Sequence, residues 1–156
     1  MTVRFACEKD IPQMNSLLYQ VERVHQQGRP DLFKDGAKKY TDNELKAMLK
    51  DKTKPIFAAV DENDVMKGYA FCVFQEHKGD NVLTDIKTLY IDDLCIDENC
   101  RGQHIGSVLY EAVKKFAKEQ GCYNVTLNVW ECNPSARKFY EKAGLKPYKT
   151  GMEVIL

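Results

Sequence analysis

The sequence lacks an excess of charge of either sign, because 23 Lys and Arg residues balance 23 Asp and Glu residues. A protein whose main partner is nucleic acid or an anionic membrane needs surplus positive charge, so we expect neither partner. The chain also has no apolar run of about 20 residues, and its first residues, MTVRFACE, contain no signal-peptide core. These absences predict a cytoplasmic protein without a membrane span.

No Cys-x-x-Cys pair occurs among the six cysteines, and the chain is too long and too charged to resemble a disulfide-framed secreted module. Reduced thiols are therefore expected. Cys95, Cys100 and His104 lie close together in the sequence, but their spacing matches no common zinc finger or ribbon. We predict no metal site, and no acyl-enzyme on a cysteine, because no cysteine lies in a motif typical of a nucleophile.

A length of 156 residues with 44% hydrophobic residues suits one domain with one sizeable core, spanning residues 1–156. Periodicity, caps and turn residues predict the elements of this domain. Strands are expected over 3–7, 55–60, 68–74, 85–96 and 125–130, helices over 11–28, 41–49, 106–120 and 133–144, and one or two final strands within 146–156. The strand-helix-strand unit over 85–130 requires a right-handed parallel crossover.

The segment IDENCRGQHIGS, over 96–107, lies between a predicted strand and a strongly amphipathic predicted helix. A glycine-bearing turn at a helix N-terminus presents free backbone N–H groups and the positive end of the helix dipole, which favours phosphate. The segment fits neither Gly-x-Gly-x-x-Gly nor Gly-x-x-x-x-Gly-Lys-Ser/Thr, the two common nucleotide motifs. Spacing alone leaves a phosphate site and a plain strand-to-helix turn both open.

Two motifs resemble the GNAT superfamily of acyl-CoA N-acetyltransferases. Arg101-Gly102-x-x-Ile105-Gly106 is similar to the family's cofactor turn, and LNVWECNPSARKFYEKAG, over 127–144, is similar to the strand and helix that follow. The resemblance covers about the last two thirds of the chain. It implies an α/β fold with a mixed, mostly antiparallel sheet, a central pair of splayed parallel strands, helices on both faces, and acetyl-CoA between the pair.

The resemblance also implies which residues contact the cofactor. The strand before the turn would line the pantetheine arm, with the N–H of Leu94 facing the thioester oxygen, and the turn would hold the pyrophosphate. His104 stands where the family usually has glycine, so we expect a modified cofactor turn. The implied cofactor residues are Leu94, Cys95, Ile96, Arg101, Gly102, Gln103, His104, Ile105, Gly106, Ser107, Asn133, Ala136 and Tyr140.

The resemblance further implies a general acid at Tyr140, near the cofactor sulfur; packing beside Phe139 is the alternative. Asp92 and Asp93 are two acids inside an otherwise apolar strand, where burial is costly and functional pKa shifts arise. They should point to opposite faces unless a β-bulge intervenes. This strand resembles that of the diamine and polyamine acetyltransferases, which makes Asp92 the leading base or amine anchor, ahead of Asp93.

The alternative for these acids is a purely structural role, in which one of them caps a loop or pairs with a lysine. Ribosomal-protein alanine acetyltransferases carry a catalytic glutamate where this chain has Asn128, which disfavours their mechanism here. For His25, an exposed position at a helix end is expected rather than a place in an acceptor cleft.

The predicted function is direct transfer of an acetyl group from acetyl-CoA to a primary amine, with a small or polyamine-like molecule as acceptor. A protein N-terminal or lysine acetyltransferase is the first alternative. A non-catalytic acyl-CoA sensor and a nucleotide-binding regulator are alternatives from other classes. The sequence leaves open a homodimer.

Overall fold

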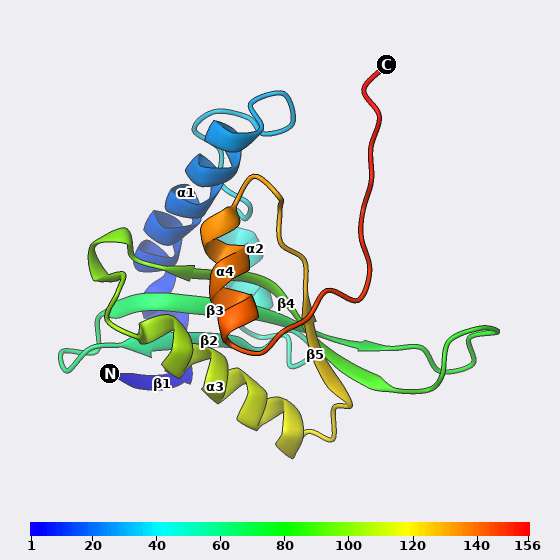
Figure 1. Ribbon diagram of the computed structural model, residues 1–156. Helices are drawn as coiled ribbons and strands as arrows, with labels where there is room; N and C mark the ends of the chain where they lie inside the picture. Colours follow the sequence, from blue (N-terminus) through cyan, green and yellow to red (C-terminus); the bar gives the residue numbers. More distant parts are fainter.

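The computed structural model describes residues 1–156, which form one five-stranded sheet in the order β1-β2-β3-β4-β5 (Figure 1). The strands are β1 Thr2–Phe5, β2 Ile56–Val60, β3 Met66–Glu76, β4 Lys87–Ile96 and β5 Asn124–Leu127. The helices are α1 Ile11–Gly28, α2 Asp42–Met48, α3 Ile105–Glu119 and α4 Pro134–Lys142. All neighbouring strands are antiparallel except the parallel pair β4 and β5. The predicted fold class is therefore confirmed.

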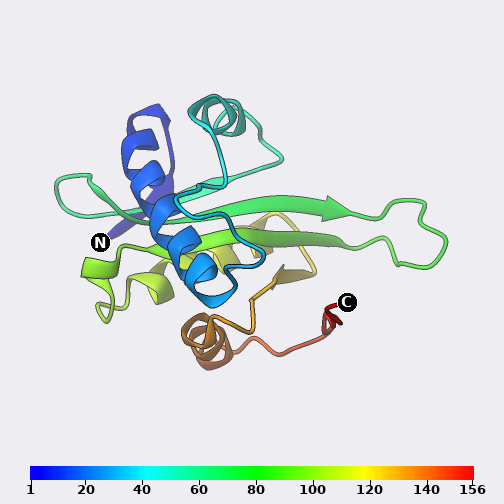
Figure 2. The same cartoon turned by 90° about the horizontal axis from the view of Figure 1, so that it is seen from above.

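Helices cover both faces of the sheet (Figure 2). Alternate residues of β2 divide the core: Ile56, Ala58 and Val60 pack with the buried stripe of α1, whereas Phe57 and Ala59 pack with α3. This alternation is the period of two that a strand imposes on its side chains. Two apolar clusters, one on each face, thus fix α1 and α3 against the same strands.

Side chains cap two of the helices. Thr41 and Glu44 form a capping box at the start of α2, and the side chain of Asn133 accepts the N–H of Ala136 at the start of α4. The carboxylate of Asp10, the residue before α1, does not cap that helix. It instead accepts hydrogen bonds from the Arg4 guanidinium and from the N–H of Cys7.

The parallel pair is short. Thr88–Ile91 of β4 pairs with Asn124–Leu127 of β5, and the two strands separate beyond that point. The prediction that the last of these strands reaches Trp130 is therefore wrong by three residues, because the backbone of residues 128–130 has left its ladder partner. The separation leaves the β5-facing edge of β4 unpaired after Ile91.

A β-bulge interrupts β4 at the same place. Phe71 pairs with Asp93 and Cys72 pairs with Ile91, so Asp92 is an extra residue without a partner in β3. The bulge cancels the alternation at this point. Asp92 contacts Tyr40 and Asp93 contacts Tyr69, and both tyrosines pack on Phe71 on the side of α1 and α2. The two acids therefore share one face of the sheet.

The final strands expected within 146–156 do not form, and this prediction is wrong. The segment leaves α4 and runs away from the sheet as an extended tail (Figure 1), where Glu153 forms an ion pair with Arg29. Its apolar side chains, including Met152 at 94% exposure, find no ladder partner and no core. As a consequence, β5 is an edge strand, and the parallel pair lies at one side of the sheet instead of at its centre.

Candidate active site

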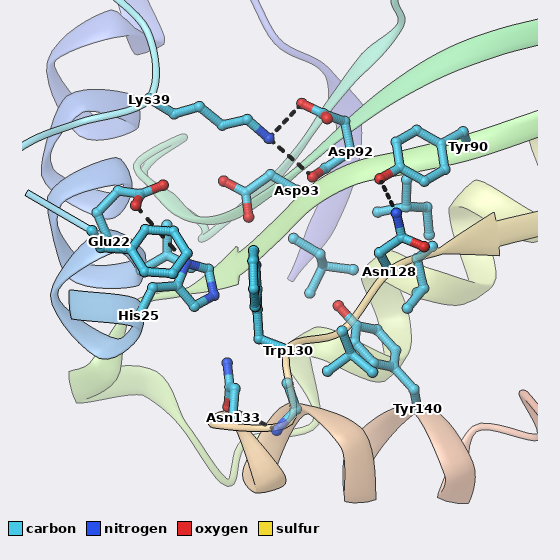
Figure 3. Close-up of a pocket in the computed structure, with 17 residues that line it drawn as sticks. Glu22, His25, Lys39, Tyr90, Asp92, Asp93, Asn128, Trp130, Asn133 and Tyr140 are labelled. Carbon is cyan, nitrogen blue, oxygen red and sulfur yellow. Dashed lines mark hydrogen bonds and ion pairs between the residues drawn. The ribbon is translucent and has the colours of Figure 1, made fainter. Parts of the chain in front are cut away.

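A pocket of about 470 Å³ lies where β4 and β5 separate (Figure 3). Its volume falls in the range typical of small-molecule sites. It is lined by Val21, Glu22, His25, Phe33, Lys39, Tyr90, Ile91, Asp92, Asp93, Leu94, Leu127, Asn128, Val129, Trp130, Asn133, Ala136 and Tyr140. The structure thus brings six of the sequence-predicted site residues together: Asp92, Asp93, Leu94, Asn133, Ala136 and Tyr140.

The two acids of β4 have different surroundings. Asp92 forms an ion pair with Lys39, with Nζ 2.9 Å from the carboxylate, and it accepts the hydroxyl hydrogen bond of Tyr40. The alternative in which one acid pairs with a lysine is therefore observed at Asp92. Asp93 accepts a hydrogen bond of 2.7 Å from the Tyr69 hydroxyl and has no cationic partner. Burial, reinforced by the charges of Asp92 and Glu22, raises the pKa of Asp93 to about 6.

An acid and a histidine on α1 form the opposite wall. The Glu22 and His25 side chains are each 16% exposed, and burial raises the pKa of Glu22 and lowers the pKa of His25. The expectation that His25 is exposed is therefore wrong, because its imidazole lines the pocket and packs against the Phe33 ring. Figure 3 shows the carboxylates of Glu22 and Asp93 facing one another across the space between α1 and β4.

Aromatic rings border the pocket where α1 ends. The Phe33 ring lies 5.2 Å from the His25 ring and meets Trp130 edge-on at 5.1 Å, so the loop after α1 contacts the segment after β5. Gly28 allows this approach: a Cβ at this position would lie 2.7 Å from Cβ of Cys132. The end of α1 is therefore joined to the loop that precedes α4.

Tyr140 enters the pocket from α4 (Figure 3). Its ring packs edge-on against Phe139 at 5.3 Å, but the two residues lie on different sides of the helix. Phe139 packs into the core under α3, whereas the hydroxyl-bearing side of Tyr140 lines the pocket. Burial raises the pKa of this phenol, which keeps its proton on the hydroxyl at neutral pH.

The predicted phosphate turn forms at the N-terminus of α3, outside the pocket lining. Gly102 and His104 both adopt positive φ, +79° and +59° respectively, and His104 is the N-cap of α3. The first N–H groups of the helix, at 105–107, have no partner within the helix. Gly106 has a packing role as well, because a Cβ there would lie 3.2 Å from the Phe139 ring.

Two other predicted cofactor residues do not line the pocket with their side chains. Cys95 is buried on the α1 side, where its thiol lies 3.5 Å from the Leu17 carbonyl oxygen, and burial raises the pKa of that thiol to about 12. Ile96 packs partly buried in the cluster under α3. A contact of these two residues with a cofactor would therefore involve their backbone groups.

Sequence reasoning missed most of the residues facing the two acids. Glu22 has a usable signal, because it stands beside the apolar stripe of α1, three residues before His25. Lys39, Phe33 and Trp130 have none, since they lie in loops that only the tertiary fold brings to β4. No three His, Cys, Asp or Glu side chains gather where they could hold a metal ion, and none of the helices combines the length and apolar character of a membrane span.

Residues 18–145 match the family model described as Acetyltransferase (GNAT) family, which is most of the chain. The chain belongs to this acetyltransferase family. The resemblance seen in the two sequence motifs is therefore confirmed. The finer similarity to diamine and polyamine acetyltransferases stays a prediction.

Curated relatives of this GNAT protein match over a shorter segment. The glucosamine 6-phosphate N-acetyltransferase of Arabidopsis thaliana is 34% identical over 59 residues, which are 38% of this chain and 38% of the relative. The enzyme of the same name from Candida albicans is 35% identical over 60 residues, again 38% of each chain. The match thus spans well under half the length of these relatives.

Solved structures match over the whole chain. A mutant of the BH1408 protein from Bacillus halodurans has a TM-score of 0.95 at 28% identity, with 100% of this chain and 99% of that chain covered. The aminoglycoside acetyltransferase meta-AAC0020 from an uncultured soil metagenomic sample, in complex with sisomicin, has a TM-score of 0.75 at 20% identity, with coverage of 99% and 94%. At that identity the second likeness concerns the fold alone.

GNAT enzymes take acetyl-CoA as acyl donor, and two features of this structure fit it. The β5-facing edge of β4 is unpaired after Ile91, so its backbone groups can bind an extended arm in the manner of a strand. The turn presents the amides of 103–107 at a helix N-terminus, which suits a pyrophosphate. Backbone groups of 94–96 would hold the arm, beside the pocket that Asn133, Ala136 and Tyr140 help to line.

The His104→Gly variant is expected to bind acetyl-CoA at least as tightly as the wild type. The backbone at this position has φ +59°, which glycine adopts freely and histidine does not favour. Isothermal titration with CoA measures the dissociation constant. A loss of affinity of more than about tenfold, or about 1.4 kcal/mol, would instead mean that the imidazole itself binds the cofactor.

Proposed function

We propose that this GNAT protein transfers the acetyl group of acetyl-CoA directly to a primary amine of a small, cationic acceptor. The observation that carries the proposal is the charge of the pocket. Three carboxylates, on Glu22, Asp92 and Asp93, face a single lysine, Lys39, and that lysine is paired with Asp92. Such a pocket attracts ammonium groups and disfavours phosphate.

The size and closure of the pocket support a small acceptor over a protein. The packing of Phe33 on Trp130 joins the loop after α1 to the segment after β5 and borders the pocket on that side. A folded protein's N-terminus or lysine needs an open groove to approach β4. The volume of about 470 Å³ also suits a small molecule together with the end of the pantetheine arm.

In the proposed reaction, Asp93 is the general base. An amine is nucleophilic only in its neutral form, so Asp93 takes a proton from the ammonium, directly or through one water. Its pKa of about 6 leaves it ionised at neutral pH and closer to an amine's pKa than an ordinary carboxylate. Asp92, which is engaged with Lys39 and Tyr40, would instead fix the geometry of the bulge and of the loop before α2.

The remaining steps fall to β4 and α4. The amine nitrogen bonds to the acetyl carbon, and the N–H of Leu94 would stabilise the developing charge on the thioester oxygen. The carbon–sulfur bond then breaks, and Tyr140 gives its hydroxyl proton to the departing thiolate. The new amide nitrogen loses its second proton, which returns to the Tyr140 oxygen directly or through water, while the proton taken by Asp93 goes to solvent. No covalent intermediate with the protein is needed.

Thiol release from acetyl-CoA, measured with a panel of amines, tests this function. The panel contains linear diamines, an aminoglycoside, glucosamine 6-phosphate and a peptide with a free N-terminus. We expect release that depends on a cationic small amine, with glucosamine 6-phosphate and the peptide as poor acceptors. If acetyl-CoA raises Tm but no amine releases thiol, the protein is a non-catalytic binder.

A further inference from the structure

Glu22 is the one pocket carboxylate to which the proposed chemistry gives no task. Its side chain extends from α1 into the pocket and is only 16% exposed. The nearest basic group is Nδ1 of His25 at 3.9 Å, which is too long for a hydrogen bond. Burial lowers the pKa of His25, so the imidazole is neutral at neutral pH and does not balance the charge of Glu22.

A carboxylate that is withdrawn from water without a partner costs free energy. Here Glu22 on α1 and Asp93 on β4 face one another, neither carboxylate has a cationic partner, and the charge of Glu22 adds to burial in raising the pKa of Asp93 (Figure 3). The only ammonium in the pocket lining is already held by Asp92 at 2.9 Å. An arriving molecule with positive charge at both places would relieve both carboxylates.

We infer that Glu22 and Asp93 mark two ammonium subsites in one pocket, so that the acceptor is a compact molecule with at least two amino groups. The inference rests on the proposed function. The amino group at Asp93 loses a proton and is acetylated, whereas the amino group at Glu22 stays charged and anchors the molecule.

The wall beside Glu22 suits this anchoring role. Phe33 stacks on His25 and meets Trp130, so aromatic faces border the space next to the carboxylate. Aromatic faces attract ammonium groups and also pack against methylene groups. A chain of methylenes or a sugar ring that links two amines would therefore contact these rings while its charged ends reach the carboxylates.

The test compares 1,5-diaminopentane with 5-amino-1-pentanol, which keeps the length and one amine but replaces the second ammonium with a hydroxyl. Steady-state kinetics at saturating acetyl-CoA give kcat/KM for each. The wild type should prefer the diamine by roughly 10- to 100-fold, the value of one charge-assisted hydrogen bond. Glu22→Gln should remove this preference by lowering kcat/KM for the diamine, with little change for the amino alcohol.

Matched controls separate the inference from a general loss of function. Glu111→Gln changes an exposed glutamate of α3 outside the pocket and should leave both substrates unaffected. Glu22→Gln keeps the side-chain shape, and Tm should not fall, because burial already disfavours the charged form of Glu22. An aminoglycoside assayed beside the linear diamines shows whether the two amines sit on a flexible chain or on a ring.

The outcomes are distinct. Equal losses for the diamine and the amino alcohol in Glu22→Gln would overturn the second subsite, and so would a wild type without preference for the diamine. Either result leaves amine acetylation intact. Absence of thiol release with every amine would instead reject the proposed function itself.

Discussion

Asp93→Asn is expected to lower kcat/KM by on the order of 10²-fold or more, because general-base catalysis contributes about 10² to 10⁴ in rate. Asparagine keeps the shape and can still accept the Tyr69 hydroxyl bond, but it cannot take a proton. The dissociation constant of acetyl-CoA should remain unchanged. Steady-state kinetics with the preferred amine, together with titration of the cofactor, measure both quantities.

The pH profile provides a second readout. A base works in its deprotonated form, so wild-type kcat/KM should rise as pH increases through about 6, the pKa of Asp93, and this rise should vanish in Asp93→Asn.

The raised pKa of Asp93 also makes the stability of the native state depend on pH, with a defined sign. A carboxyl whose folded pKa is raised from 3.8 destabilises the native state once it ionises, so native stability falls as pH rises from about 4 to 6. At pH 8 the asparagine variant should therefore keep or increase Tm.

Asp92→Asn is the matched comparison, because the neighbouring acid occupies the same wall but is bound to Lys39. Asp92→Asn should lower kcat/KM less than Asp93→Asn does, and its kcat/KM should still rise with pH near 6. If Asp92→Asn is the more damaging change and abolishes that rise, the base is Asp92, as the sequence resemblance favours.

Tyr140→Phe should lower kcat by on the order of 10²-fold or more, while the acetyl-CoA dissociation constant stays nearly unchanged. The substitution removes only the hydroxyl and preserves the edge-on packing of the ring on Phe139. Kinetics with saturating substrates measure the loss. The deficit should shrink with an acetyl thioester of a more acidic thiol, because such a thiolate leaves without needing a proton.

Tyr123→Phe is the control for the tyrosine variant, since Tyr123 is 76% exposed and lies outside the pocket. It should keep the wild-type rate. A wild-type rate in Tyr140→Phe as well would show that protonation of sulfur is not assisted by this residue. Tyr140 would then have only the packing role that its neighbour Phe139 has.

The features that could be predicted from the sequence are those with local causes. Each of these features depends on a few adjacent residues: the capping box at Thr41, the start of α4 at Asn133-Pro134, and the end of α3 before Gly121. The turn before α3 is equally local, and the positive φ of His104 is a conformation that glycine adopts more freely than histidine.

The features that could not be predicted depend on residues far apart in the chain. Glu22 faces Asp93 because α1 packs on one face of the sheet and the bulge in β4 turns the Asp93 side chain to that same face. The strands predicted within 146–156 do not form, because a segment becomes a strand only where a neighbouring strand pairs with it, and these residues have no such neighbour. The local pattern does not contain either fact.

The bulge at Asp92 has an evolutionary consequence. The partners on either side of it, Cys72 with Ile91 and Phe71 with Asp93, are already successive positions of β3. Loss of one codon at position 92 would join the two halves of β4 into an uninterrupted ladder, with every remaining pair and every side-chain face preserved. The acid that holds Lys39 is thus the one residue of this stretch of β4 that the ladder with β3 does not require.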